Sequence, residues 1–245
     1  MGEDRQWFLI NASPDLRQQI ENMPALQPTA DSVRNTPIAG VFLTNADLDH
    51  ALGLLLLRQQ DNRLIVYADA LTRRALKWID HMLRPFCGME WRDLTHDRFN
   101  RSSLLAPESS GNGLAFRAIK SRKSVAFELR DERSSKTAVV APAVGELNDA
   151  LCEAINSAEV VLFDGTFWSN DELHAVRPNA RNAHEMNHLP IREGSLEFLR
   201  DSGAHRKIYM HINNTNPILM PGSVERDAVE RAGIEIGHDG LEMVL

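Results

Sequence analysis

The amino-acid sequence predicts an α/β fold, in one domain over residues 1–245, and three observations support this. The chain has 245 residues and is 43% hydrophobic, which is enough to bury one substantial core. Apolar runs rich in β-branched and aromatic residues alternate with segments of helical periodicity. Several of these runs stop abruptly at polar residues, and α/β proteins place their chemistry in loops at the carboxyl ends of strands.

Composition excludes several classes of protein. The formal net charge of −7 argues against a nucleic-acid partner, because proteins that bind phosphate backbones usually carry a basic surface. Cys87 and Cys152 are the 2 cysteines, too few for a disulfide framework or a cysteine-rich zinc module. The longest apolar stretch, residues 51–57, is far too short to cross a membrane, and the first residues show no signal pattern. We therefore expect a cytoplasmic protein without membrane or nucleic-acid partners.

The first part of the chain alternates strands and helices. Strands are predicted at residues 7–11, 38–43 and 64–68. A first helix should begin with Ser13 as its N-cap and end near Asn22. The buried face expected of a helix over residues 70–83 consists of Leu71, Ala75, Trp78, Ile79 and Met82. Residues 84–113 lose this periodicity and end in a polar, glycine-containing loop over residues 102–113.

The first predicted strand begins close to Met1, so we expect its edge to lack the hairpin that would normally cover it. Uncovered strand edges pair readily with other chains. We therefore expect an amino-terminal hairpin to be missing and the chain to form a homo-oligomer.

The second part of the chain is predicted to add an antiparallel sheet and further strand–helix pairs. Its strands are expected at residues 114–119, 124–129, 137–141, 160–163, 206–210, 234–236 and 243–245, with a hairpin turn at 130–136. Its helices are expected at residues 142–158, 193–200 and 223–232, the last with Ser223 as N-cap and Gly233 at its end. Residues 170–187 are polar and too numerous for a simple turn, which indicates a functional loop.

The strand at residues 38–43 is followed by a dense group of polar residues: Asn45, Asp47, Asp49 and His50. Two carboxylates and an imidazole between buried elements are costly unless a cation or hydrogen bonds satisfy them. A metal would do so. The alternative is that Asp47 or Asp49 caps the helix that starts near Ala51, with His50 as a hydrogen-bonded polar residue.

Two further strands end in the same kind of residue. Asp164 ends one strand and His211 ends another, while His188 lies in the polar loop between them. One mononuclear or dinuclear metal site explains these residues together with Asp49 and His50. Imidazole and carboxylate ligands suit iron, zinc or manganese.

The order of these residues resembles the metallo-β-lactamase superfamily, which implies a four-layer αββα sandwich. The segment from Asn45 to His50 stands where that superfamily carries His-x-His-x-Asp-His, so Asn45 and Asp47 replace the two leading histidines. Five segments resemble the coenzyme pyrroloquinoline quinone (PQQ) synthesis protein B family. They are residues 11–17, 43–58, 164–168, 185–190 and 211–219.

That resemblance implies an oxygen-using mononuclear iron(II) hydroxylase, with dioxygen as co-substrate, acting on the tyrosine ring of a small Glu-Tyr-derived precursor of PQQ. An older interpretation of the family is transport of the cofactor or its precursor. The sequence departs from the family at three places. The amino-terminal glycine-rich strand and cysteine-rich metal knot have no counterpart, residues 102–143 match weakly, and Asn187 stands where glycine is expected.

Asp49, His50 and His211 are predicted as a two-histidine, one-carboxylate metal face, with Asp164 and His188 as further candidate ligands. Substrate contacts are assigned to Asn45, Asp47, Asn213 and Asn216. A second hypothesis is a zinc hydrolase in which Asp164 bridges two metals and Asp49 acts as base on a metal-bound water. A third is a non-catalytic carrier of PQQ or its precursor.

Overall fold

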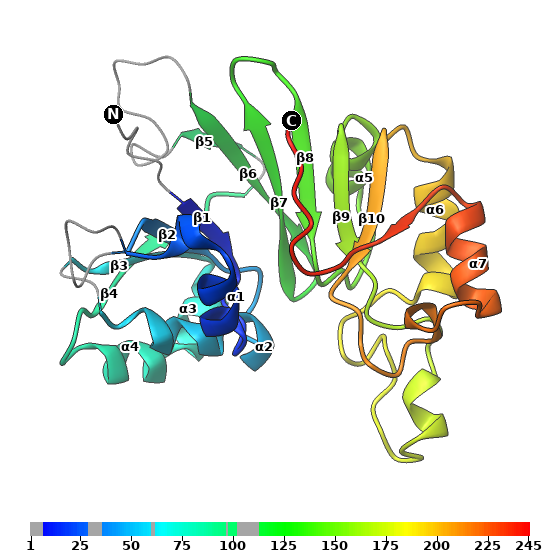
Figure 1. Ribbon diagram of the computed structural model, residues 1–245, viewed down its shortest axis with the longest axis horizontal. Helices are drawn as coiled ribbons and strands as arrows, with labels where there is room; N and C mark the ends of the chain where they lie inside the picture. The colour runs from blue at the N-terminus through cyan, green and yellow to red at the C-terminus, as the bar shows by residue number, and fades with distance from the viewer. Residues whose placement is uncertain (1–6, 29–35, 60–61, 97, 102–112) are drawn as a thin grey trace. The chain divides into compact units, whose positions relative to one another are not determined.

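The computed structural model describes residues 7–28, 36–59, 62–96, 98–101 and 113–245. The chain forms two compact units, unit 1 over Met1–Thr95 and unit 2 over His96–Leu245 (Figure 1). Within the loop expected at residues 102–113, only Gly113 belongs to the described residues. The single domain over residues 1–245 stays a prediction.

Unit 1 contains a parallel four-stranded sheet in the order β1-β2-β3-β4. Its strands are β1 (Trp7–Ile10), β2 (Ile38–Phe42), β3 (Leu64–Ala68) and β4 (Met89–Asp93). The first three confirm the predicted strands. The sequence did not predict β4, because this edge strand buries only Met89 and so lacks a recognisable apolar pattern. β1 lies at the opposite edge, and the association of copies through it stays a prediction.

Helices pack on the unit 1 sheet and enclose one core. They are α1 (Leu16–Asn22), the 3-10 helix η1 (Pro24–Leu26), α2 (Leu48–Ala51), the 3-10 helix η2 (Leu52–Leu57), α3 (Ala70–Ala75) and α4 (Lys77–Leu83). Leu16, Leu54 and Ile79 lie in the same buried cluster. The prediction of Ser13 as N-cap was wrong, because Asp15 occupies that position and makes no side-chain cap bond.

The predicted buried face of residues 70–83 was also largely wrong. The helix is interrupted at Leu76, and its buried residues are Thr72, Leu76, Ile79 and Leu83. Leu71, Trp78 and Met82 are instead 56%, 42% and 54% exposed. Helical spacing allowed either face, and contact with the sheet selected the face that lies about one residue further along the chain.

Unit 2 contains a seven-stranded mixed sheet in the order β11-β10-β9-β8-β7-β6-β5. Its strands are β5 (Phe99–Arg101), β6 (Leu114–Ser121), β7 (Ser124–Asp131), β8 (Thr137–Ala141), β9 (Val160–Asp164), β10 (Arg206–Met210) and β11 (Glu235–Ile236). β5 to β8 are antiparallel and β8 to β11 parallel, which confirms the predicted hairpin. Residues 243–245 form no strand; Met243 and Leu245 pack against Ala138, Val160 and Ile208.

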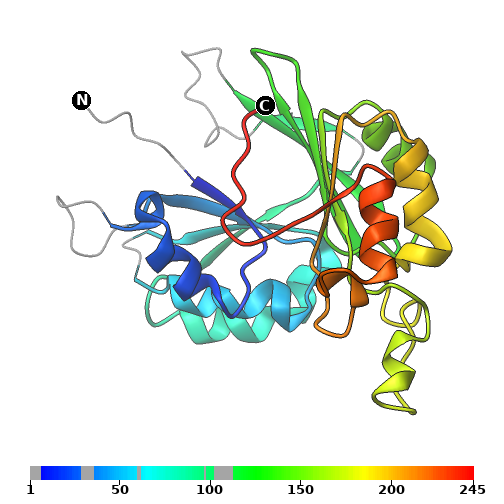
Figure 2. The ribbon, with the colours of Figure 1, turned by 45° about the vertical axis from the view of Figure 1, so that its right-hand side comes forward.

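Three helices cover one face of the unit 2 sheet: α5 (Asp149–Asn156), α6 (Leu196–Asp201) and α7 (Val224–Arg231) (Figure 2). The π-helix η4 (Ile191–Ser195) leads into α6. Asn148 caps α5, so the helix starts later than the predicted residue 142. Ser223 caps α7 and Gly233 follows it with a φ of 72°, as predicted.

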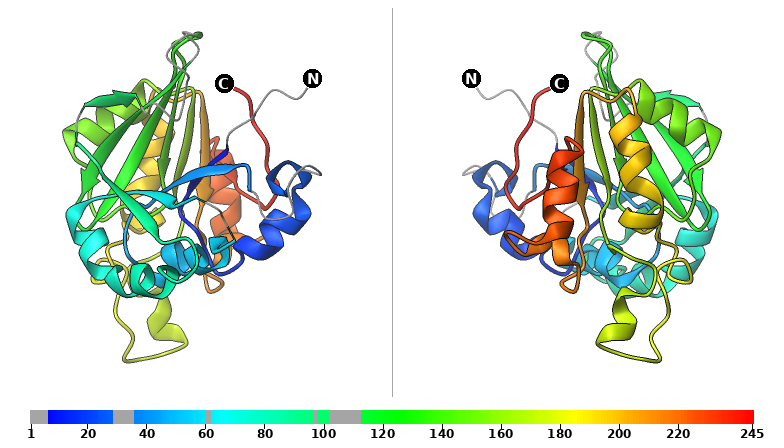
Figure 3. Two further views of the ribbon diagram at one scale, coloured as in Figure 1. Left: turned by 90° about the vertical axis from the view of Figure 1, so that its left-hand side faces the viewer. Right: turned by 90° about the vertical axis from the view of Figure 1, so that its right-hand side faces the viewer.

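The polar residues after β9 form an extended loop, as predicted. This loop includes the 3-10 helix η3 (Glu172–Ala175) and projects away from the unit 2 sheet (Figure 3). A second 3-10 helix, η5 (Pro217–Leu219), follows β10. Among the described residues, no helix has the length and apolar character needed to cross a bilayer.

Gly53 holds two segments of unit 1 together. Its N–H donates to the Ala12 carbonyl oxygen at 2.8 Å, and the Ala12 N–H donates to the His50 carbonyl oxygen at 2.7 Å. A Cβ at position 53 would collide with the Ser13 carbonyl oxygen and would lie 2.8 Å from that of Ala12. The loop after β1 is thus packed against the helix that carries His50.

We predict that Gly53→Ala lowers the free energy of unfolding by about 2 kcal/mol or more, because backbone atoms on both sides must shift. Urea unfolding measures this change. Gly40→Ala is the matched control, since a Cβ at Gly40 meets its nearest neighbours at 3.4 Å, an ordinary contact distance. Equal stability of the two variants would contradict the packing described for Gly53.

Candidate metal centre

The polar loop after β2 places His50 in a defined orientation within unit 1. The Asn11 Oδ1 accepts hydrogen bonds from the Thr44 N–H at 2.9 Å and from the Thr44 Oγ1 at 3.1 Å. The Thr44 Oγ1 also lies 3.0 Å from the His50 Nδ1. Because the single hydroxyl hydrogen is donated to Asn11, Thr44 accepts the Nδ1–H of His50. Nε2 is then the ring nitrogen with which His50 would bind a metal.

Asn45 and Asp47, in the same loop, bond to each other. The Asn45 Nδ2 donates to the Asp47 Oδ2 at 2.8 Å, and the Asp47 N–H donates to the Asn45 Oδ1 at 3.0 Å. Asp47 occupies the N-cap position of α2 without a side-chain cap bond, and Asp49 lies exposed in the first turn. The substrate contacts assigned to Asn45 and Asp47 stay predictions.

Asp164 ends β9 and is fully buried. Its Oδ1 accepts from the Thr166 N–H at 3.0 Å and from the Thr166 Oγ1 at 2.6 Å. Its Oδ2 accepts from the Val144 N–H at 2.8 Å and pairs with the His188 Nδ1 at 2.7 Å. A carboxylate offers about four lone-pair sites, so Asp164 is satisfied by the protein around it.

The environment of Asp164 favours its ionised form. Burial by itself raises the pKa of a carboxyl group. At Asp164 the charge and hydrogen bond of His188, with the charge of His211, outweigh burial and hold the pKa below its usual value. The ionised carboxylate can only accept hydrogen bonds, so His188 donates through Nδ1 and would bind a metal through Nε2.

Asn187 explains how the chain turns into His188. Its φ is 69°, in the left-handed region that glycine and asparagine adopt most readily. This accounts for asparagine at a position where the family resemblance predicts glycine. The Asn187 amide also donates to the Ser124 Oγ at 3.3 Å, and its oxygen packs so closely on Gly145 that a Cβ there would collide with it.

His211 follows β10 directly and has a φ of 56°, which is uncommon for a residue with a side chain. Its Nδ1 lies 2.8 Å from the Thr166 Oγ1. The rings of His188 and His211 are nearly parallel, with centroids 5.7 Å apart and an interplanar angle of 21°. Ligand atoms of Asp164, His188 and His211 all lie within 4.8 Å of one another. The two imidazoles are suitable ligands for iron, zinc or manganese, and Asp164 as a direct ligand stays a prediction, because its oxygens already accept hydrogen bonds from the protein.

Asn213 and Asn216 follow His211 and are held differently. Asn216 is buried; its Nδ2 donates to the Gly165 carbonyl oxygen at 2.8 Å and its Oδ1 accepts from the Ile218 N–H at 3.1 Å. The Asn213 Nδ2 donates to the Thr215 Oγ1 at 2.7 Å. The amide of Asn216 therefore ties two strand-end loops together, and substrate contacts of both residues stay predictions.

Glu172 was not predicted as part of the site. Its carboxylate accepts from the Thr215 Oγ1 at 2.5 Å and from the Trp168 N–H at 2.6 Å, and burial raises its pKa. It therefore joins the loops that follow β9 and β10. Thr44 and Thr166 were also missed, although both lie in the strand-end polar runs that predicted the ligands.

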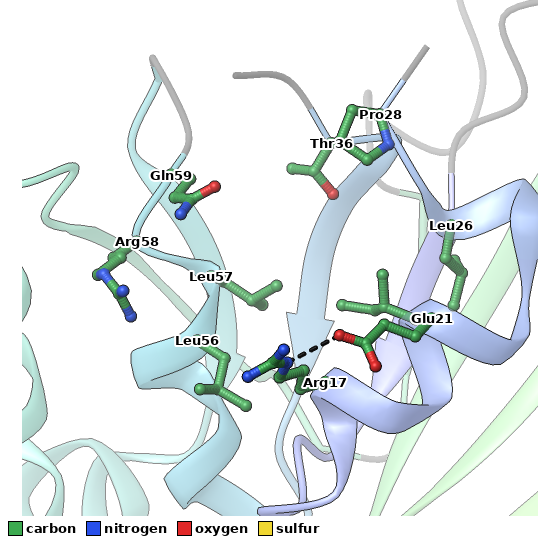
Figure 4. A pocket seen from close by; sticks show the side chains of 10 residues that line it. Arg17, Glu21, Leu26, Pro28, Thr36, Leu56, Leu57, Arg58 and Gln59 are labelled. Carbon is green, nitrogen blue, oxygen red and sulfur yellow. Dashed lines mark hydrogen bonds and ion pairs between the residues drawn. The ribbon is translucent and has the colours of Figure 1, made fainter. Parts of the chain in front are cut away.

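Unit 1 also contains a pocket of about 360 Å³ (Figure 4). It is lined by Arg17, Ile20, Glu21, Leu26, Pro28, Thr36, Leu56, Leu57, Arg58 and Gln59. An exposed ion pair of 2.8 Å joins Arg17 to Glu21. This lining includes none of the predicted metal ligands or substrate contacts, so the pocket does not bear on the metal chemistry.

Comparisons with known proteins give a consistent result. The beta-lactamase superfamily domain matches residues 6–212. Coenzyme PQQ synthesis protein B of Cupriavidus necator is 37% identical over 263 residues, with 100% of this chain and 85% of the relative covered. The zinc-bound PqqB structure from Methylobacterium extorquens has 27% identity and a TM-score of 0.84, with 100% and 85% covered. A diphosphatase of the PhnP family, at 18% identity, TM-score 0.66 and 100% and 82% coverage, shares the fold. The predicted metallo-β-lactamase fold is confirmed.

We predict that Asp164→Asn lowers the free energy of unfolding by about 3 kcal/mol. The NH₂ group that replaces one carboxylate oxygen would face the groups that now donate hydrogen bonds to that oxygen, and two donors cannot bond to each other. Chemical denaturation measures the loss. Asp171→Asn, an exposed change in the nearby loop, should leave stability within about 0.5 kcal/mol. If both variants unfold like the wild type, Asp164 does not have the central role described.

Proposed function

Because the chain belongs to the coenzyme PQQ synthesis protein B family, we propose that it acts in the synthesis of PQQ as a metal-dependent enzyme. Relatives of that name match it over 85% of their length, at 37% and 36% identity. Metal dependence is supported by the zinc-bound state of the solved PqqB structure from Methylobacterium extorquens. It is also supported by the imidazoles of His188 and His211, which lie close to each other and to the Asp164 carboxylate that orients His188.

One observation carries the proposal of a metal site. In His50, His188 and His211, the Nδ1 nitrogen is engaged by a neighbouring hydroxyl or carboxylate. Metal-binding histidines are typically oriented in this way, with the second ring nitrogen turned to the ion. Asp49 and His50 belong to unit 1, and their inclusion with His211 in the ligand set rests on the sequence motif.

The proposed reaction is hydroxylation of the tyrosine ring of a small Glu-Tyr-type precursor. Each hydroxylation replaces a ring C–H by C–OH with one oxygen atom of dioxygen, and a two-electron reductant from solution, with two protons, converts the other oxygen atom to water. Iron(II), when bound, would supply the redox chemistry needed to use dioxygen, which zinc lacks. The protein's own contribution is to hold His188 and His211 in fixed tautomers and to keep the Asp164 carboxylate ionised. Asn213, fixed through Thr215 and Glu172, is proposed to orient polar groups of the substrate.

Replacement of the two leading histidines of the superfamily motif by Asn45 and Asp47 favours one metal over two. Within unit 1 these two side chains bond to each other. A zinc hydrolase is the second candidate, favoured by the zinc in the solved relative. Two metals per chain, together with hydrolysis of an ester or lactone, would identify that alternative; one metal per chain supports the oxygenase.

We predict that His50→Ala and His211→Ala each abolish metal retention, because each removes an imidazole ligand. Metal content is measured by elemental analysis after anaerobic loading and gel filtration. His81→Ala is the matched control, since His81 is an exposed histidine of α4, and it should retain metal like the wild type. Wild-type metal content in either ligand variant would remove that residue from the site.

We predict that the protein loaded with iron(II), in air and with a two-electron reductant such as ascorbate, adds oxygen atoms to the tyrosine ring of a small Glu-Tyr-type peptide. Peptide mass spectrometry measures the product. Asp49→Ala should stop the reaction, because it removes the carboxylate of the predicted metal face, and zinc loading should also stop it. Equal product with zinc, or without dioxygen, would show that the proposed chemistry is wrong.

A further inference from the structure

The Thr166 hydroxyl lies between two groups of the candidate metal centre. Thr166 is 7% exposed. Its Oγ1 is 2.6 Å from the Asp164 Oδ1, 2.8 Å from the His211 Nδ1 and 3.0 Å from the His211 carbonyl oxygen. The ionised Asp164 carboxylate and the His211 carbonyl oxygen have no hydrogen to donate, so both can act only as acceptors.

A hydroxyl group has one hydrogen, which settles the direction of these bonds. The carboxylate is the closest acceptor, and bonds to charged acceptors are the stronger ones. If the hydrogen were instead turned toward the His211 Nδ1, the short contact with Asp164 would hold two oxygens together without a hydrogen. The Thr166 Oγ1 therefore accepts the Nδ1–H of His211.

We propose that Thr166 is a positioning residue that fixes the tautomer of His211 and couples His211 to His188. The coupling runs from His188 Nδ1 to Asp164 at 2.7 Å, from Asp164 to the Thr166 hydroxyl at 2.6 Å, and from that hydroxyl to His211 Nδ1 at 2.8 Å. Each end of this chain is an Nδ1–H donor. Both imidazoles are thereby set to offer Nε2 to a metal ion.

The backbone of the same segment holds His211 in place. The Asn213 N–H donates to the Thr166 carbonyl oxygen at 3.1 Å, and the Gly165 N–H donates to the Met210 carbonyl oxygen at 2.8 Å. These bonds bracket His211, whose left-handed φ of 56° is costly for a side-chain-bearing residue. Thr166 thus restrains the ring and the backbone of His211 together.

The test compares Thr166→Val, which keeps the shape and removes the hydroxyl, with Thr166→Ser, which keeps the hydroxyl. Zinc(II) affinity is measured by competition with a chelator. Thr166→Val should bind zinc about 10- to 100-fold more weakly, the usual effect of losing a partner that orients a ligand. Thr166→Ser should stay within about threefold of wild type. Equal zinc affinity of Thr166→Val and wild type would overturn the proposal.

Thr137→Val is the matched control. Thr137 is a buried threonine of β8 in the same unit, and its hydroxyl donates to the Ser157 carbonyl oxygen at 3.4 Å. Because it is not part of the candidate metal centre, zinc affinity should not change. An equal loss in Thr137→Val would show that the effect at Thr166 is general destabilisation, and would overturn the proposal.

A second readout requires neither bound metal nor turnover. ¹⁵N–¹H NMR of the histidine rings in the metal-free wild-type protein should show His211 as the Nδ1–H tautomer, and Thr166→Val should lose that preference. Nε2–H in the wild type would overturn the proposal even if Thr166→Val did not fold. The role of Thr166 rests on the proposed metal site, but different measurements test the role and the site. Absence of zinc binding by the wild type counts against the proposed function, and the wrong tautomer counts against Thr166.

Discussion

Asp164 has no exposed surface, and its two oxygens accept four hydrogen bonds from Val144, Thr166 and His188. A buried carboxylate is stable only when its lone pairs are satisfied in this way. Because its partners come from three different segments after strands β8 and β9, one side chain fixes their relative positions. The long loop that ends in His188 is attached again next to it, through the Leu189 N–H and the Val144 carbonyl oxygen at 2.7 Å.

The same physical solution occurs in unit 1 with different residues. Thr44 stands between Asn11 and His50, as Thr166 stands between Asp164 and His211. In both cases a threonine hydroxyl donates to a fixed oxygen and accepts from an imidazole Nδ1. Parallel strands bring such loops to one edge of a sheet, so short segments distant in sequence can each supply one oriented donor. This arrangement suits metal binding better than it suits folding alone, because the left-handed φ of His211 costs stability.

The sequence predicts the parts of this site that depend on local pattern. Apolar runs ending in Asp164 and His211 were visible as strand ends, and both residues lie where expected. The roles of Thr44 and Thr166 depend on hydrogen bonds between segments, which local pattern does not contain. The same reason explains the wrong buried face of α3 and α4, where contact with the sheet chose between two helical faces. Strand β4 was missed because an edge strand with charged residues lacks the apolar alternation that marks a strand.

The central claim is that oriented imidazoles of this chain bind a single metal ion. X-ray absorption spectroscopy of the protein, loaded anaerobically with iron(II) and combined with metal quantification, tests it most directly. The account predicts one iron per chain with imidazole nitrogens at about 2.1 Å, a normal distance for histidine ligands. Two metals per chain with a short metal–metal distance, or an oxygen-only shell without imidazole scattering, would contradict it.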